Sequence, residues 1–130
     1  MKHQAIPPET EQVARLVLDA AFAVHKALGP GLLESVYEAC ICHELELLGI
    51  TVQRQYPVKV RYRGIELETG FRVDVLVGSL LVLELKSIDA LLPVHEAQLL
   101  TYLRLTGCRL GFLMNFNVGM LRDGIKRMVN

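Results

Sequence analysis

The segment FRVDVLVGSLLVLELKS, residues 71–87, contains two short runs of aliphatic residues separated by Gly78. Such runs are typical of strands in a buried sheet. Three charged residues lie inside them: Asp74, Glu84 and Lys86. Because burying a charge without a partner is unfavourable, these side chains need a specific explanation.

The alternation of side chains along a strand predicts which of these residues share a face. When the apolar faces of the two runs are matched in an antiparallel hairpin, Val75 lies beside Leu83. The connection then consists of residues 78–80, and Asp74 lies directly across from Glu84. The segment therefore predicts a hairpin that brings two carboxylates together on one face.

Two carboxylates at that spacing repel each other unless a positive group lies between them. Oxygen ligands of this kind favour Mg²⁺ or Mn²⁺, which polarises a phosphodiester and lowers the pKa of an attacking water. Lys86 would orient that water, help to deprotonate it, or stabilise negative charge in the transition state. A cross-strand salt network is the alternative, with Asp74 paired to Lys86 and Glu84 paired to Arg72.

The rest of the chain predicts a mixed α/β fold in which helices cover a sheet. The first helix is expected to begin after Thr10 as its N-cap. In chain order, we expect helices over 11–28 and 33–48, a long strand with a short return over 51–70, strands over 71–77 and 81–87, a helix over 94–105, a strand over 109–116, and a tail that forms a short helix or an edge strand.

The length of 130 residues and the hydrophobic content of 52% are typical of a single domain. We expect that domain to span residues 1–130, with residues 1–10 as a flexible N-terminal arm. No apolar run has the length of a membrane span, so we expect a cytoplasmic protein without a membrane partner. The 14 basic and 14 acidic side chains cancel, so any nucleic acid must be held by a local patch.

The Asp74 and Glu84-Leu85-Lys86 pattern resembles the PD-(D/E)xK nuclease superfamily, although Val73 stands where the superfamily has a proline. The segment GLLESVY, residues 31–37, fits the signature G-x-x-E-x-x-Y, and the chain resembles the GxxExxY protein family. Other matching pieces are VHKALGPGLLESVYE, VDVLV, LELKS, VHEAQLLTYL, and GFLMNF followed by GIKR. The resemblance runs from about residue 14 to residue 129. It implies a restriction-endonuclease-like core, with helices flanking a central mixed β-sheet.

The resemblance also implies a nuclease that uses Mg²⁺ or Mn²⁺ to hydrolyse phosphodiester bonds in DNA or RNA. Asp74 and Glu84 would hold the metal, and Glu34 matches the helix glutamate of the motif and would be a third acid. With Lys86, these three residues form the expected catalytic set. Without the resemblance, Glu34 is better explained by the preference of glutamate for a helix N-terminus.

Four further residues are expected to contact the substrate. Gln98 and Tyr102 lie four positions apart on one helix face and resemble the Q-x-x-x-Y element of RecB-like nucleases. His95 matches a family position near the start of the same helix, and Arg72 shares the strand face of Asp74.

Two other functions stay open. The chain is alternatively a catalytically silent nuclease-fold protein that binds nucleic acid or a protein partner. It is otherwise an interaction protein in which the polar hairpin face is only a salt network. We also allow for a homodimer, because a chain this small often needs a second copy to hold a duplex.

Overall fold

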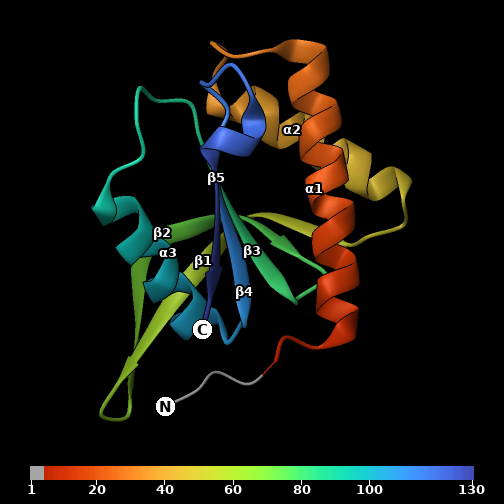
Figure 1. Cartoon of the computed structure of the whole chain (residues 1–130). Coiled ribbons are helices and arrows are strands. Elements are labelled where there is room, and N and C mark those ends of the chain that lie inside the picture. The colour runs from red at the N-terminus through yellow and green to blue at the C-terminus, as the bar shows by residue number, and fades with distance from the viewer. Residues whose placement is uncertain (1–4) are drawn as a thin grey trace.

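A five-stranded mixed sheet forms the centre of the molecule, and helices cover both of its faces (Figure 1). The computed structural model describes residues 5–130. Its elements are α1 (Pro8–Leu28), α2 (Glu34–Leu47), β1 (Val52–Tyr62), β2 (Ile65–Val77), β3 (Leu81–Lys86), α3 (Pro93–Thr106), β4 (Leu110–Asn115), the 3-10 turn η1 (Leu121–Gly124) and β5 (Ile125–Val129). The strands are ordered β1-β2-β3-β4-β5, with β3 and β4 parallel and the other neighbours antiparallel. This architecture confirms the predicted restriction-endonuclease-like fold class.

The two faces of the sheet are covered by different helices, α1 and α2 on one side and α3 on the other (Figure 1). Leu81, Leu83 and Leu85 of β3 pack into the core formed with α1 and α2. Val82 packs into the second core, beneath α3. Because side chains alternate along β3, Glu84 lies on the α3 side with Val82.

Helix α3 packs very closely on the sheet because β4 has a glycine beneath it. A Cβ atom at Gly111 would lie 3.0 Å from side-chain atoms of both Leu99 and Leu103, and 3.2 Å from the carbonyl oxygen of Val82. These distances are shorter than ordinary van der Waals contacts, so a Cβ atom here would require Leu99 and Leu103 to shift. The glycine in RLGFLMNF therefore allows the close approach of the helix that borders the candidate site.

The N-terminal region begins its helix earlier than the sequence predicts. Pro8 occupies the first turn of α1, where proline is well tolerated because its missing N–H would have no helical partner. Thr10 is buried inside that turn and is not the N-cap. Of the predicted arm over residues 1–10, residues 1–4 lie outside the described residues, and 8–10 belong to α1.

Strand β2 also differs from the prediction, which divided it into a short return and a separate strand over 71–77. The structure has one continuous strand, Ile65–Val77, which passes through Gly70 with φ of 77°. Arg63 and Gly64 have φ of 45° and 86° and form the two-residue turn between β1 and β2. The resulting long hairpin extends away from the rest of the sheet (Figure 1).

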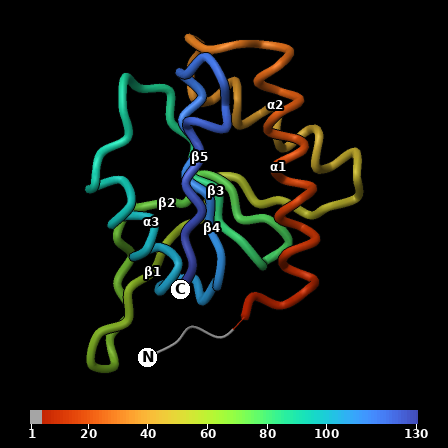
Figure 2. The backbone as a smooth tube through the Cα atoms, in the orientation of Figure 1, coloured from red at the N-terminus to blue at the C-terminus, as the bar shows by residue number. Residues whose placement is uncertain are grey.

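Several loops meet at the end of the sheet where β3 and β4 terminate (Figure 2). The Ser87 hydroxyl donates to the carbonyl of Leu32, at 2.6 Å, which ties the corner between α1 and α2 to the end of β3. The Asn115 side-chain amide donates to the carbonyl of Ile88, at 2.9 Å. These contacts place the G-x-x-E-x-x-Y segment beside the strand that carries Glu84.

Tyr37 organises the corner from within. Its ring is fully buried and stacks on Phe116, with 4.4 Å between ring centroids. Its hydroxyl donates to the carbonyl of Gly29, at 2.6 Å, and accepts from the Leu32 N–H, at 3.1 Å. The tyrosine of the motif thus has a structural role.

Within residues 5–130, no helix has the length and apolar character needed to cross a membrane.

We expect Tyr37→Phe to lower the free energy of unfolding by about 1–2 kcal/mol, because two backbone groups of the corner lose their partner. Urea unfolding followed by circular dichroism measures this change. Tyr62→Phe is the matched control, since Tyr62 is 60% exposed on the β1–β2 hairpin. Equal effects of the two substitutions would contradict the structural role of the Tyr37 hydroxyl.

Candidate active site

The site begins where β2 and β3 stop pairing. The predicted register is confirmed from Val77 opposite Leu81 to Val75 opposite Leu83. Beyond that point the backbone ladder ends, and the Leu85 N–H donates to Oδ2 of Asp74, at 2.7 Å. The side chain of Asp74 therefore takes the place of a backbone acceptor and is held beside the second strand.

Glu84 is buried next to Asp74. Only 5% of the surface of Glu84 is exposed to solvent. Burial raises its pKa to about 10, and the hydrogen-bonding contact with Asp74 and the charge of Asp74 add to the shift. Its Oε1 atom has no hydrogen-bond partner among the described residues. Such a carboxyl either keeps its proton or requires a cation.

Lys86 and Tyr102 border the two acids. Lys86 ends β3 half-buried, and its charge acts against the upward shift of the Glu84 pKa. Tyr102 comes from α3, and its pKa is raised first by burial and then by the charges of Glu84 and Asp74. The strands and the helix α3 therefore contribute to one polar centre.

Helix α2 contributes a third acid, Glu38, from the other side of the sheet. Glu38 is buried, and its Oε2 accepts from Nε of Arg54, at 2.9 Å, within an ion pair. Its Oε1 accepts from Nε2 of Gln55, at 2.7 Å. The same Gln55 nitrogen lies 3.5 Å from Oδ1 of Asp74. Gln55 thus joins the acid of α2 to the acid of β2.

The contacts of Glu38 require an irregular strand. Arg54 and Gln55 are consecutive, and in a regular strand their side chains would point to opposite faces. Gln55 has φ of 52°. It does not pair with β2, although its neighbours do: Arg54 lies opposite Val75, and Tyr56 lies opposite Val73. This left-handed residue turns both donors toward Glu38. Such strain in a non-glycine residue is typical of functional sites.

The alternative of a cross-strand salt network is not what the structure shows. Arg72 donates from Nη1 to the carbonyl of Gln55, at 3.1 Å, and so supports the irregular strand. In the described part of the chain, no ion pair joins Asp74 or Glu84 to Arg72 or Lys86. The two acids are therefore not neutralised by the side chains that the alternative required.

The other predicted residues lie at varying distances from this centre. Glu34 is exposed in the first turn of α2, and no hydrogen bond or ion pair joins it to the acids. His95 accepts at Nδ1 from the Leu92 N–H, at 2.9 Å, and so caps the start of α3. Gln98 is exposed, on the same helix as the buried Tyr102.

Sequence reasoning missed Glu38 and Gln55. Glu38 follows Tyr37 at once and shares a helix face with Glu34, four positions away, so periodicity alone does not separate the two acids. No sequence signal marks Gln55, because its role depends on a left-handed backbone that the strand pattern hides.

The donor set fits a hard divalent cation. Mg²⁺ commonly binds one or two carboxylates and keeps several waters, and the Asp74 and Glu84 pair has an unpartnered buried oxygen for it. Within residues 5–130, no three side chains of the His, Cys, Asp and Glu types already enclose a metal position. The pair of strand carboxylates is therefore the part of the site that the structure presents for a cation.

The burial of Glu84 predicts that the stability of the metal-free protein depends on pH. The unfolded chain releases this proton near the ordinary pKa of 4.5, whereas the folded chain retains it to about pH 10. Between these values the unfolded state binds fewer protons, so the free energy of unfolding falls as pH rises, by at most about 1.4 kcal/mol per pH unit.

We therefore expect Glu84→Gln, which mimics the protonated acid, to raise the free energy of unfolding at pH 8 and to flatten its decline from pH 5. Urea unfolding in EDTA at both pH values measures this. The exposed Glu46→Gln on α2 is the control. A decline from pH 5 to pH 8 that is the same in Glu84→Gln as in the wild-type protein would rule out the buried proton.

Comparison with known proteins supplies the family. A model of the PD-(D/E)XK nuclease superfamily matches residues 11–128. The crystal structure of SSO0001 is similar at a TM-score of 0.48 and 20% sequence identity, over 91% of this chain and 56% of that chain. This chain therefore spans little more than half the length of SSO0001. No curated protein matches the sequence. Because the family model covers nearly every described element, the chain belongs to the PD-(D/E)XK nuclease superfamily.

Proposed function

We propose that this protein is a Mg²⁺- or Mn²⁺-dependent nuclease that hydrolyses phosphodiester bonds in DNA or RNA. Membership of the superfamily supports a nuclease-type function that involves nucleic acid and a divalent metal. The observation that carries the proposal is the buried Glu84, with an unpartnered oxygen beside Asp74. A structural carboxylate in this position would need a partner, whereas a metal ligand leaves an oxygen available.

Each residue has a defined part in this proposal. Asp74 and Glu84 would hold the ion, which when bound supplies charge neutralisation for the phosphodiester and a lower pKa for water. Lys86 would hold the attacking water in place or stabilise negative charge as it develops. Tyr102, Gln98, His95 and Arg72 remain the proposed substrate-side residues. Tyr102 has the most direct support, since its pKa responds to the charges of both acids.

We also propose membership of the GxxExxY protein family within the superfamily. Gly31 has φ of 93°, a conformation that favours glycine, and Tyr37 closes the corner through its hydroxyl. Two letters of the signature thus have structural roles. For the third acid we propose Glu38, one turn beyond the motif residue Glu34, because Gln55 links it to Asp74.

Nucleic-acid binding without cleavage is the second candidate function. The contacts of Glu38 favour this candidate, because Arg54 and Gln55 already donate to its two carboxylate oxygens. An acid held in this way has less capacity for a metal. Calorimetric titration with Mn²⁺ at neutral pH separates the candidates, since a protein that only binds nucleic acid would take up no ion at Asp74 and Glu84.

We expect Glu84→Ala and Lys86→Ala each to reduce Mg²⁺-dependent cleavage by at least about 100-fold, because one removes a metal ligand and the other the group that acts on the water. Labelled single-stranded and duplex DNA and RNA, with Mg²⁺ and with Mn²⁺, form the assay. Glu46→Ala and Lys26→Ala, both exposed on helices of the opposite face, should leave the rate unchanged. Undiminished cleavage by both site variants would overturn the proposed mechanism.

The choice between Glu38 and Glu34 has its own test. We expect Glu38→Gln to weaken Mn²⁺ binding by about 10-fold or more, because a carboxylate charge near the ion is lost. Glu34→Gln, at the exposed position one turn away, should leave the affinity unchanged. Isothermal titration calorimetry measures both. The opposite result would assign the third acid to Glu34, as the motif implies.

A further inference from the structure

Two adjoining grooves lie between the β1–β2 hairpin and helix α3. The first, of about 260 Å³, has mainly apolar walls that include Val58, Val60 and Leu105. Phe71 of β2 also lines it and is 58% exposed. A large aromatic ring open to water at a groove is typical of a binding surface.

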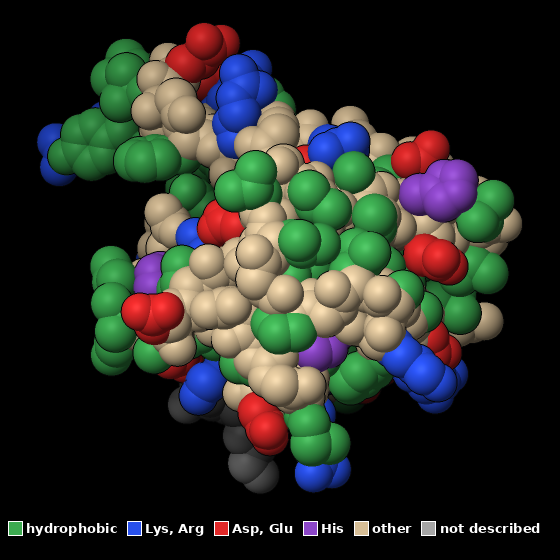
Figure 3. Space-filling model, turned by 90° about the horizontal axis from the view of Figure 1, so that it is seen from above, with side chains coloured by type: hydrophobic (Ala, Val, Ile, Leu, Met, Phe, Trp, Pro, Cys, Tyr) green, Lys and Arg blue, Asp and Glu red, His purple; other side chains and the backbone are tan. Residues whose placement is uncertain are grey.

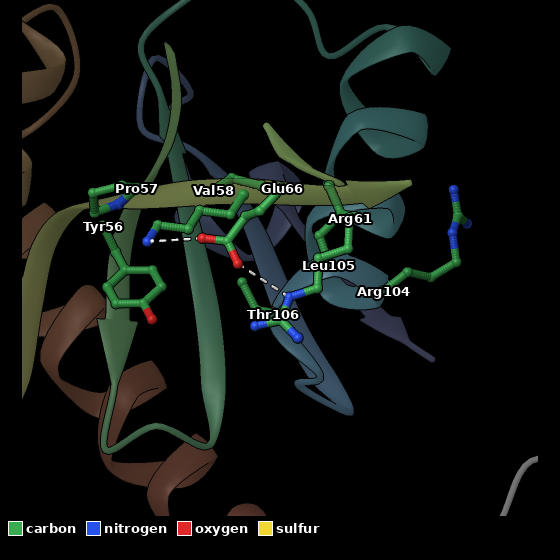
Figure 4. Close-up of a pocket in the computed structure, with 9 residues that line it drawn as sticks. Tyr56, Pro57, Val58, Arg61, Glu66, Arg104, Leu105 and Thr106 are labelled. Carbon is green, nitrogen blue, oxygen red and sulfur yellow. Dashed lines mark ion pairs between the residues drawn. The ribbon is translucent and has the colours of Figure 1, made fainter. Parts of the chain in front are cut away.

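The second groove, of about 630 Å³, is basic (Figure 4). Lys59 and Arg61 both pair with Glu66, at 3.3 Å and 3.2 Å. Arg104 of α3 lies apart from these pairs and donates to the Thr101 hydroxyl, at 3.1 Å. The groove is therefore lined by three cations and one carboxylate, and Arg104 is not paired with that carboxylate. Elsewhere charges are mixed: the face in Figure 3 intersperses acidic and basic side chains, and the whole chain has no net charge.

The two grooves share a wall formed by Val58 and Leu105. An aromatic, apolar groove thus lies directly beside a positively charged one. A nucleotide has the same two parts, a flat base and an anionic phosphate, and in a single strand both are accessible. In a duplex the faces of the bases are stacked inside, where Phe71 does not reach them.

The apolar groove also includes the buried Tyr102 of α3. It therefore lies on the face of the sheet on which Glu84 is found, the face covered by α3.

From this juxtaposition we infer that the paired grooves bind single-stranded nucleic acid, with an unpaired base against Phe71 and the phosphate backbone along Lys59, Arg61 and Arg104. This inference rests on the proposed function and names its substrate class. A second copy of the chain is the competing occupant of the apolar groove. A two-fold contact there would bring two grooves with excess positive charge toward each other, which electrostatic repulsion disfavours.

Fluorescence anisotropy in EDTA, where no metal-dependent cleavage occurs, tests the inference with labelled dT12 and a duplex of the same length. We expect dT12 to bind at least about 10-fold more tightly than the duplex. Phe71→Ala should weaken dT12 binding by about 5- to 150-fold, the range for losing one stacked base. Arg104→Ala should lower the slope of log affinity against log salt by about 0.7, as one phosphate contact is lost.

Phe22→Ala and Arg15→Ala are the matched controls, since both side chains are exposed on α1, on the other face of the sheet. Phe71→Leu keeps an apolar side chain without the aromatic face and should lose affinity as Phe71→Ala does. It keeps the test valid when Phe71→Ala is unstable.

Equal affinity for dT12 and duplex, or unchanged dT12 affinity in both Phe71 variants, would overturn the inference. So would a light-scattering result in which Phe71→Ala converts a dimer to a monomer while dT12 affinity is kept. These outcomes are distinct from failure of the proposed function. Selective dT12 binding without metal-dependent cleavage would refute only the nuclease, and cleavage that is insensitive to Phe71→Ala would refute only this site.

Discussion

The burial of Glu84, with one carboxyl oxygen unpartnered, is the constraint to which the rest of the site is adapted. A buried polar atom without a partner costs on the order of 1–3 kcal/mol, and no described residue relieves it at Oε1. A second acid is also held beside Glu84, because the Leu85 N–H donates to the carboxylate of Asp74. Proteins retain such unfavourable arrangements mainly where they serve binding or catalysis.

The third acid shows how the protein manages charge near this position. Glu38 approaches from the helix layer opposite α3, and it is neutralised by Arg54 and bound by Gln55. Both donors come from consecutive residues of β1, which only the left-handed Gln55 makes compatible with a strand. The carbonyl of Gln55 is in turn held by Arg72. A residue expected to contact substrate thus also supports the backbone that positions an acid.

The sequence was sufficient to predict the hairpin but not the acids around it. Face matching in residues 71–87 depends only on the two-residue period of strands, so the register from Val75 opposite Leu83 and the connection over 78–80 were predicted correctly. Beyond Val75 the backbone pairing ends and the Leu85 N–H bonds to the Asp74 side chain, which strand periodicity does not predict. Glu38 and Glu34 share a helix face, so the proposed choice of Glu38 depends on its contact with Gln55, which the helical pattern does not predict. The continuity of β2 through Gly70 was missed because glycine usually signals a turn.

The arrangement of layers also restricts how a substrate reaches the acids. On one face, α1 and α2 pack against β3 through fully buried leucines, and Glu38 is covered there with its oxygens bonded. On the other face, two open grooves lie between α3 and the β1–β2 hairpin, and Tyr102 lines the apolar one. Under the proposed function, a substrate strand would approach Glu84 from the α3 side, with the long hairpin as one wall of the groove.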